Sequence, residues 1–135
     1  MTTYTVSSGV TSSGLTLNTG DNLYVYSGGV AENTAVNGGA TAFLFPGGVA
    51  SGTTVNNGGQ QNVAGGGTAI LTVVNSGGHE SVQFVGTASG TVIYGVEQVY
   101  SSGTATGGVV ESGGQEVAFG GGVVSGTIVS NGGNQ

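Results

Sequence analysis

The hydrophobic residues of this chain fall in short runs that glycine pairs interrupt at regular intervals. The runs are rich in Val and Thr, as in residues 30–36, 49–55, 68–74 and 87–93. β-Branched residues favour strands, and Gly-Gly pairs favour tight turns. No stretch repeats apolar residues at the spacing of an amphipathic helix. The pattern therefore predicts an all-β protein built from short strands.

Glycines, most of them in Gly-Gly pairs, form two periodic series along the chain. The first runs through Gly9, Gly28, Gly47 and Gly66 in equal steps and resumes with the same step at Gly103 and Gly122. The second, about half a period away, takes steps of 19, 20, 19, 17, 19 and 19 through Gly20, Gly39, Gly59, Gly78, Gly95, Gly114 and Gly133. Such periods are typical of solenoids, because one unit buries its hydrophobic face only against the next. We predict a single β-solenoid domain over residues 1–135, with about seven coils of about 19 residues, each containing two strands and two Gly-Gly turns.

Stacking of the coils at a spacing of about 4.8 Å would align equivalent residues in columns. An aliphatic column, which we place inside, contains Val36, Val55, Val74, Ile93, Val110 and Val129. A threonine column two residues earlier contains Thr34, Thr53, Thr72, Thr91 and Thr127, with Gly108 as a gap. Strand alternation puts both columns on one face, but a bend at Gly52, Gly90, Gly107 or Gly126 could shift the phase, so the orientation of the threonines stays open. An asparagine column (Asn18, Asn37, Asn56 and Asn75) could pair its amides between coils.

Composition and charge exclude several classes of function. The chain has 31 glycines, no Lys, no Arg and no Cys, and its net charge is −6. Without cations it cannot displace counterions from nucleic acid or bind anionic lipid. Without cysteine it has no disulfide and no thiolate metal site. No apolar run approaches the roughly 20 residues of a membrane-spanning helix, and no signal-peptide pattern opens the chain.

Two segments carry a resemblance to a known family. Residues 27–41 and 46–61 share Gly-Gly-Val-Ala, a Thr three residues later and a Val two residues after that, before the next Gly-Gly. This pattern resembles the strand-loop-strand passenger repeats of AIDA-type autotransporter adhesins, and it covers nearly the whole chain. Residues 4–15 also resemble the start of bacterial proteins that carry these repeats before a C-terminal Hint-type self-cleaving domain.

The resemblance implies an extracellular or cell-surface β-helix that serves in self-association, adhesion and biofilm, with Ser and Thr carrying heptose in some members. From this resemblance we expect a structural protein and not an enzyme. The expected partners are other copies of the chain, matrix polysaccharide or cell surfaces, without nucleic acid or membrane insertion.

The residues that could carry chemistry all have a simpler interpretation. His79, the only histidine, neighbours Glu80, but no further His or Cys completes a site. Asp21 is the only aspartate, so a regular calcium ladder of the glycine-aspartate type is not expected. Residues 65–67 and 120–122 are Gly-Gly-Gly, but they lack the Lys and the helix of a phosphate-binding loop. We therefore predict no catalytic, cofactor-binding or metal-binding residues.

Two alternative functions rest on side-chain columns. The threonine column suggests ice binding, although this needs two parallel rows of Thr on one exposed face. The aromatic residues Tyr24, Tyr26, Phe43 and Phe45, with Tyr4 before them, suggest a carbohydrate-binding strip. Alternation along a strand would instead let one of each pair fill the core or a rim.

Neither end of the repeat shows a capping segment. Uncapped coils expose strand edges that recruit another chain, and a contact between unlike ends propagates into a filament. The sequence thus predicts head-to-tail homopolymers, while continuation of a longer adhesin explains bare ends equally well.

Overall fold

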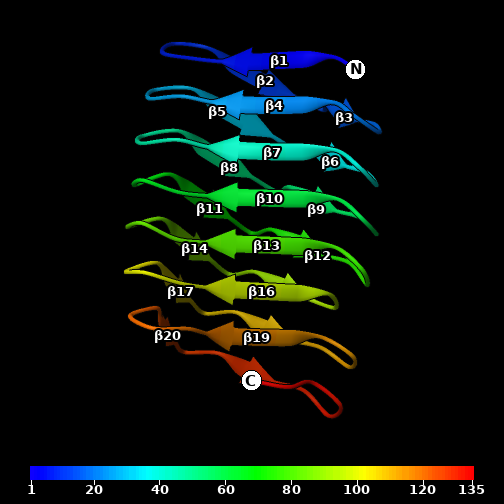
Figure 1. The fold of residues 1–135 in the computed structure, drawn as a ribbon, viewed down its shortest axis with the longest axis vertical. Coiled ribbons are helices and arrows are strands. Elements are labelled where there is room, and N and C mark those ends of the chain that lie inside the picture. The colour runs from blue at the N-terminus through cyan, green and yellow to red at the C-terminus, as the bar shows by residue number, and fades with distance from the viewer.

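The computed structural model describes residues 1–135, which wind into a stack of coils that confirms the predicted β-solenoid of about seven turns (Figure 1). Every strand pairs in parallel with its equivalent in the adjoining coil, which gives three seven-stranded sheets. The first sheet contains β1 (Thr3–Val6), β4 (Asn22–Val25), β7 (Thr41–Leu44), β10 (Gln60–Val63), β13 (His79–Val82), β16 (Val96–Val99) and β19 (Gln115–Ala118). The second contains β2 (Thr11–Ser13), β5 (Val30–Glu32), β8 (Val49–Ser51), β11 (Thr68–Ile70), β14 (Thr87–Ser89), β17 (Thr104–Thr106) and β20 (Val123–Ser125). The third contains β3 (Thr16–Leu17), β6 (Ala35–Val36), β9 (Thr54–Val55), β12 (Val73–Val74), β15 (Val92–Ile93), β18 (Val109–Val110) and β21 (Ile128–Val129).

Each coil has three strands, so the prediction of two strands per coil was wrong. A residue with positive φ divides each predicted Val/Thr segment into a strand of the second sheet and a strand of the third. The bends proposed at Gly52, Gly90, Gly107 and Gly126 are confirmed, with φ between 65° and 69°. Asn33 (φ 51°) and Leu71 (φ 54°) make the same bend without glycine. This third bend of the coil therefore does not show as a regular glycine series in the sequence.

The register confirms that equivalent residues lie on top of one another. Val55 pairs with Val36 on one side and with Val74 on the other. The offset between paired strands is the same at every step but one: His79 pairs with Val96, since the turn after Ile93 is two residues shorter. The step of 20 residues in the second glycine series came from matching Gly39 with Gly59. In the structure the equivalent of Gly39 is Gly58, whose carbonyl accepts a hydrogen bond from the Gly39 amide at 3.0 Å.

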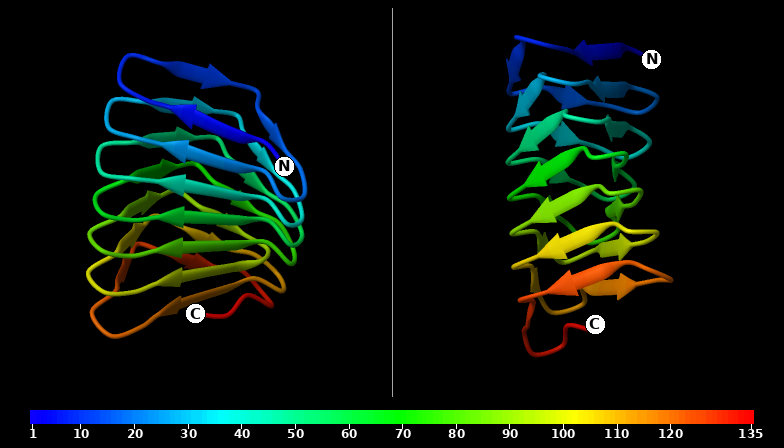
Figure 2. Two further views of the ribbon diagram at one scale, coloured as in Figure 1. Left: turned by 45° about the horizontal axis from the view of Figure 1, so that its top comes forward. Right: turned by 90° about the vertical axis from the view of Figure 1, so that its left-hand side faces the viewer.

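Hydrogen bonds between coils continue through the turns. The Gly9 amide donates to the Gly28 carbonyl at 3.2 Å, and the Gly20 amide donates to the Gly39 carbonyl at 2.9 Å. The coils therefore stay in register along the whole axis, with the two chain ends at opposite ends of the stack (Figure 2). The chain forms no apolar helix of membrane-crossing length.

The core consists of inward-facing columns from all three sheets. The aliphatic column predicted to be inside is fully buried at Val36, Val55, Val74, Ile93 and Val110. Val129 is 43% exposed, because no coil covers it. Buried alanines fill the second sheet's column (Ala31, Ala50, Ala69, Ala88 and Ala105).

Candidate functional site

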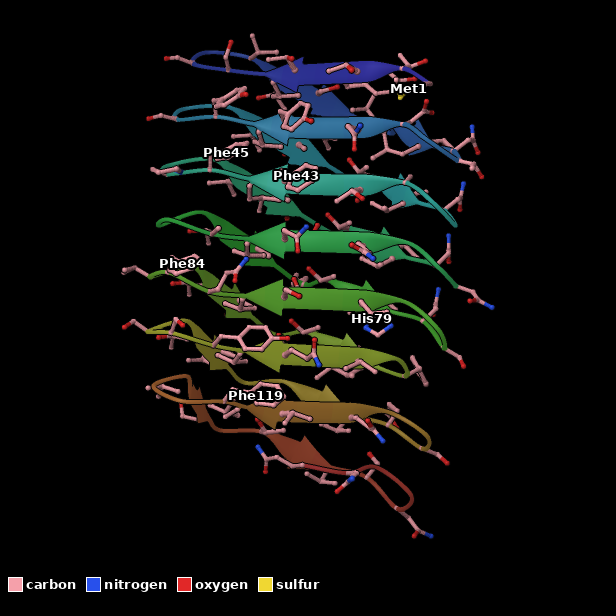
Figure 3. The ribbon with its side chains drawn as sticks, in the orientation of Figure 1. Met1, Phe43, Phe45, His79, Phe84 and Phe119 are labelled. Carbon is pink, nitrogen blue, oxygen red and sulfur yellow. The ribbon has the colours of Figure 1, made fainter.

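The outer face of the first sheet carries an aromatic patch, which we define as Tyr24, Tyr26, Phe43 and Phe45 (Figure 3). Leu23 and Val25 alternate with the two tyrosines and point into the core. The Tyr26 and Phe45 rings stack between coils, with centroids 4.9 Å apart and planes at 8°. Tyr26 is 42% exposed, so the patch meets solvent.

The expectation that each aromatic pair divides between core and surface was wrong. The two members of a pair are two residues apart and therefore share a face. Tyr4 differs, because it is half-buried and packs against the core in the first coil. A second outward pair, Tyr100 and Phe119, stacks at 4.9 Å near the other end of the same sheet.

The asparagine column forms the predicted ladder along one turn. The Asn56 side-chain amide donates to the Oδ1 of Asn37 at 2.8 Å, and the Asn75 amide donates to the Oδ1 of Asn56 at 2.8 Å. Asn37 donates to Asn18 at 3.3 Å. This row ties the turns of the first four coils together and ends where Tyr94 replaces asparagine.

The threonine column faces inward, so the proposed basis for ice binding was wrong. Thr34, Thr53, Thr72 and Thr91 are 1–2% exposed, and ice cannot reach them. They share the inner face with the aliphatic column, as strand alternation suggested, because the bend precedes both columns.

His79 and Glu80 cannot act together, because they lie on opposite faces of β13. His79 is exposed on the outer face (Figure 3), whereas Glu80 is fully buried. Both Gly-Gly-Gly segments are strand-to-strand turns that no helix follows, and Gly66 and Gly121 adopt positive φ there.

Asp21 holds the first coil in place. Its carboxylate accepts hydrogen bonds from the backbone amides of Thr2 at 2.6 Å and Asn18 at 2.9 Å. The amides of Asn18 and Thr2 hold the pKa of Asp21 below its usual value. No three His, Cys, Asp or Glu side chains of the chain are arranged to hold a metal ion.

Sequence reasoning missed a buried polar column on the inner face of the first sheet. Gln61, Glu80, Glu97 and Glu116 are at most 1% exposed. From the sequence, Glu80 was considered only as the neighbour of His79, and the other glutamates counted only toward the net charge. The available signal was their spacing, which follows the coil period and includes its one short step, between Glu80 and Glu97.

The comparisons with known proteins agree with this architecture. Residues 2–59 and 40–96 match the AIDA family model, described as an adhesin of the bacterial autotransporter system, probable stalk. The matches together span residues 2–96, more than half of the chain. The chain belongs to the AIDA family of autotransporter adhesins. This confirms the resemblance based on the Gly-Gly-Val-Ala repeats, and membership in the AIDA family implies a cell-surface or extracellular location.

One solved structure extends the similarity to the whole chain. The AIDA-family chain is 32% identical to a TibA fragment that is hyper-glycosylated in a TibC-catalysed reaction, with a TM-score of 0.69. The match covers 98% of this chain and 62% of the TibA fragment, so the chain spans less than two thirds of that structure. No curated protein matches the chain.

Proposed function

We propose that this chain is a non-catalytic adhesin stalk module that associates with further copies of itself through the ends of its coil stack. The supporting observation is that β1 and β20 each have a hydrogen-bonded neighbour on one side only. Unpaired strand edges of this kind accept a strand from another chain. The two ends differ, so the contact joins unlike surfaces and propagates into a fibre.

The side chains at the last coil suit such a contact. Val129 continues the inner aliphatic column and is 43% exposed, and Ile128 beside it is 64% exposed. The open end of the core is a hollow whose lining includes Glu116, Val124 and Gln135. A coil with the same column pattern would cover these residues and pair with the strand edges.

The test compares two lysine variants with the wild-type chain. Val129→Lys places a charge on the open end, whereas Ile70→Lys makes a similar change at a side-wall residue that is 36% exposed. We expect light scattering to show mass growing with concentration for the wild type and Ile70→Lys, and no growth for Val129→Lys. A wild-type chain that stays monomeric up to its solubility limit, without fibres in electron micrographs, would contradict the proposal.

The aromatic patch supports carbohydrate binding as a second function. Tyr24, Tyr26, Phe43 and Phe45 offer apolar ring surface beside the polar side chains of Asn62 and Ser81 on the same outer face. Aromatic surface with nearby polar groups suits a sugar. The charge of −6 without any cation favours a neutral ligand over an anionic one.

Binding of a neutral oligosaccharide, cellohexaose, would be followed by NMR shifts, with an oligogalacturonate as the anionic comparison. We expect shifts around the patch with cellohexaose only, and their loss in Tyr26→Ala and Phe45→Ala. Tyr94→Ala is the control, because Tyr94 is 41% exposed and has no stacked ring. Equal binding by all three variants would exclude the patch as the site.

A further inference from the structure

The inner face of the first sheet changes its chemistry halfway along the stack. The second residue of each strand is Leu23 in β4 and Ala42 in β7, then Gln61 in β10. In the next three strands this position is Glu80, Glu97 and Glu116, and Gln135 follows one coil later. We call this column of three glutamates the carboxyl ladder. It occupies the interior, where β4 and β7 place aliphatic side chains.

An amide closes the carboxyl ladder at each end. The Nε2 of Gln61 donates to the Oε1 of Glu80 at 2.8 Å, and the Nε2 of Gln135 donates to the Oε2 of Glu116 at 2.8 Å. The hydroxyl of Thr91 lies between Glu80 and Glu97, at 3.1 Å from the Oε2 of Glu80 and 3.2 Å from the Oε1 of Glu97. Hydrogen bonds therefore join Glu80 to Glu97 through Thr91, whereas Glu116 is bonded only to Gln135.

The donors present are too few for three ionised carboxylates. Glu97 Oε2 and Glu116 Oε1 are buried without a hydrogen-bond partner, and so is Gln61 Oε1. A buried acceptor without a donor is costly, and a buried charge without a counter-charge is costlier. The chain contains no Lys or Arg that could neutralise the carboxyl ladder. Protons are the remaining donors that these side chains can supply themselves.

No other titratable side chain faces the carboxyl ladder. The third-sheet side contributes threonines, and the second sheet contributes alanines such as Ala88 and Ala105. His79 lies on the opposite face of β13, Glu111 lies in the turn after β18, and the terminal residue Gln135 is exposed. The carboxyls of the ladder therefore interact mainly with one another.

We propose that the carboxyl ladder is a proton-binding element that keeps at least one shared proton at neutral pH, centred on Glu97, and that losing this proton loosens the C-terminal coils. A proton on Glu97 lets this side chain donate to a neighbouring carboxyl and removes one of the adjacent negative charges. Burial raises the pKa of Glu80, against hydrogen bonds from Gln61 and Thr91 that lower it. Burial also raises the pKa of Glu97 well above its usual value, with further increases from the charge of Glu80 and from Glu116.

The sign of the pH effect follows from proton linkage. Between the ordinary pKa of Glu, about 4.3, and the raised values, the folded chain binds more protons than the unfolded chain. Stability is therefore fully present below this interval and falls as the pH rises through it. Asp21 has the opposite effect: its stabilisation is present above its unfolded pKa and is lost as the pH falls through its lowered folded pKa.

The first experiment measures Tm against pH for the wild type, Glu97→Gln and Glu32→Gln. We expect the wild-type Tm to fall by roughly 3 °C or more from about pH 5 to about pH 8. Glu97→Gln should at least flatten this fall, since a neutral amide replaces the titrating group and Gln61 already fits the same column. Glu32 is exposed, so Glu32→Gln should keep the wild-type profile. A wild-type Tm that is constant or rises over this range would overturn the proposal.

Two measurements on the wild-type chain keep the proposal testable if Glu97→Gln does not fold. The ¹³C shifts of the five Glu carboxyls should show at least one group still protonated at about pH 7; five carboxyls that titrate near 4.3 would overturn the proposal. Amide hydrogen exchange, corrected for intrinsic rates, should lose protection at high pH in β13, β16 and β19 but not in β4 and β7. Equal loss throughout would show that the carboxyl ladder does not act on the C-terminal coils.

Discussion

At the scale of single residues, turn conformation and residue type usually agree, but two turns depart from this, of which the one after β16 uses Ser101 (φ 40°) and Ser102 (φ 67°). Most turns between the first and second sheets place glycine in the left-handed region, as at Gly28 and Gly47 with φ of 75°. The equivalent turn after β13 uses Phe84 (φ 48°) and Val85 (φ 65°). A β-branched residue is strained there, because its side chain crowds the backbone. Phe84 and Val85 are also exposed to solvent, and Phe84 lies at the edge of the coil stack (Figure 3).

Replacing Val85 by glycine should stabilise the chain. Relief of the left-handed strain exceeds the extra entropy that glycine gives the unfolded chain, so we expect Val85→Gly to raise the free energy of unfolding by about 1 kcal/mol. Val30→Gly in β5 is the matched control and should lower it, because Val30 is not at positive φ. Urea denaturation measures both changes. Destabilisation by Val85→Gly of the same size as by Val30→Gly would contradict the strain.

At the scale of the elements, the second glycine of a turn is required for a different reason. Gly48 does not adopt positive φ, but a Cβ on it would overlap the carbonyl oxygen of Val25 in the coil before. The turn lies against this backbone because the coils stack at strand spacing. In the Gly-Gly pair, the first glycine is therefore needed for its positive φ, and the second is needed because a Cβ there would overlap the neighbouring coil.

Alanine at the second glycine should open the coil stack. We expect Gly48→Ala to lower the free energy of unfolding by about 2–3 kcal/mol, since the backbone atoms that it meets cannot move away without breaking the ladder. Gly120→Ala should change it by less than about 0.5 kcal/mol, because nothing lies within 4 Å of its Cβ position. Chemical denaturation of the two variants compares the effects. Equal effects would mean that the close approach at Gly48 does not limit stability.

At the scale of the whole molecule, the two halves of the stack are held together differently. The main hydrophobic cluster includes Leu17 and Val36 of the third sheet, but not the equivalent Val74 and Ile93 of later coils. In those coils the carboxyl ladder and its threonines lie in the interior. Backbone pairing is the same throughout, so the pH dependence proposed above belongs to the C-terminal half, while the end-to-end association that we propose would depend on the open coils.

The period of the sequence by itself determined the solenoid, its axis of stacking and the contents of the Val/Ile and asparagine columns. These features follow from local rules, because a repeat that returns to the same place in every coil must stack like on like. Only the tertiary structure decided the number of strands per coil, since Asn33 and Leu71 turn the chain without glycine. The tertiary structure also decided whether each column faces the core or the solvent. The bend precedes the threonines and the Val/Ile column alike and so turns the threonines inward, while alternation along the first-sheet strands turns three of the six acidic residues inward.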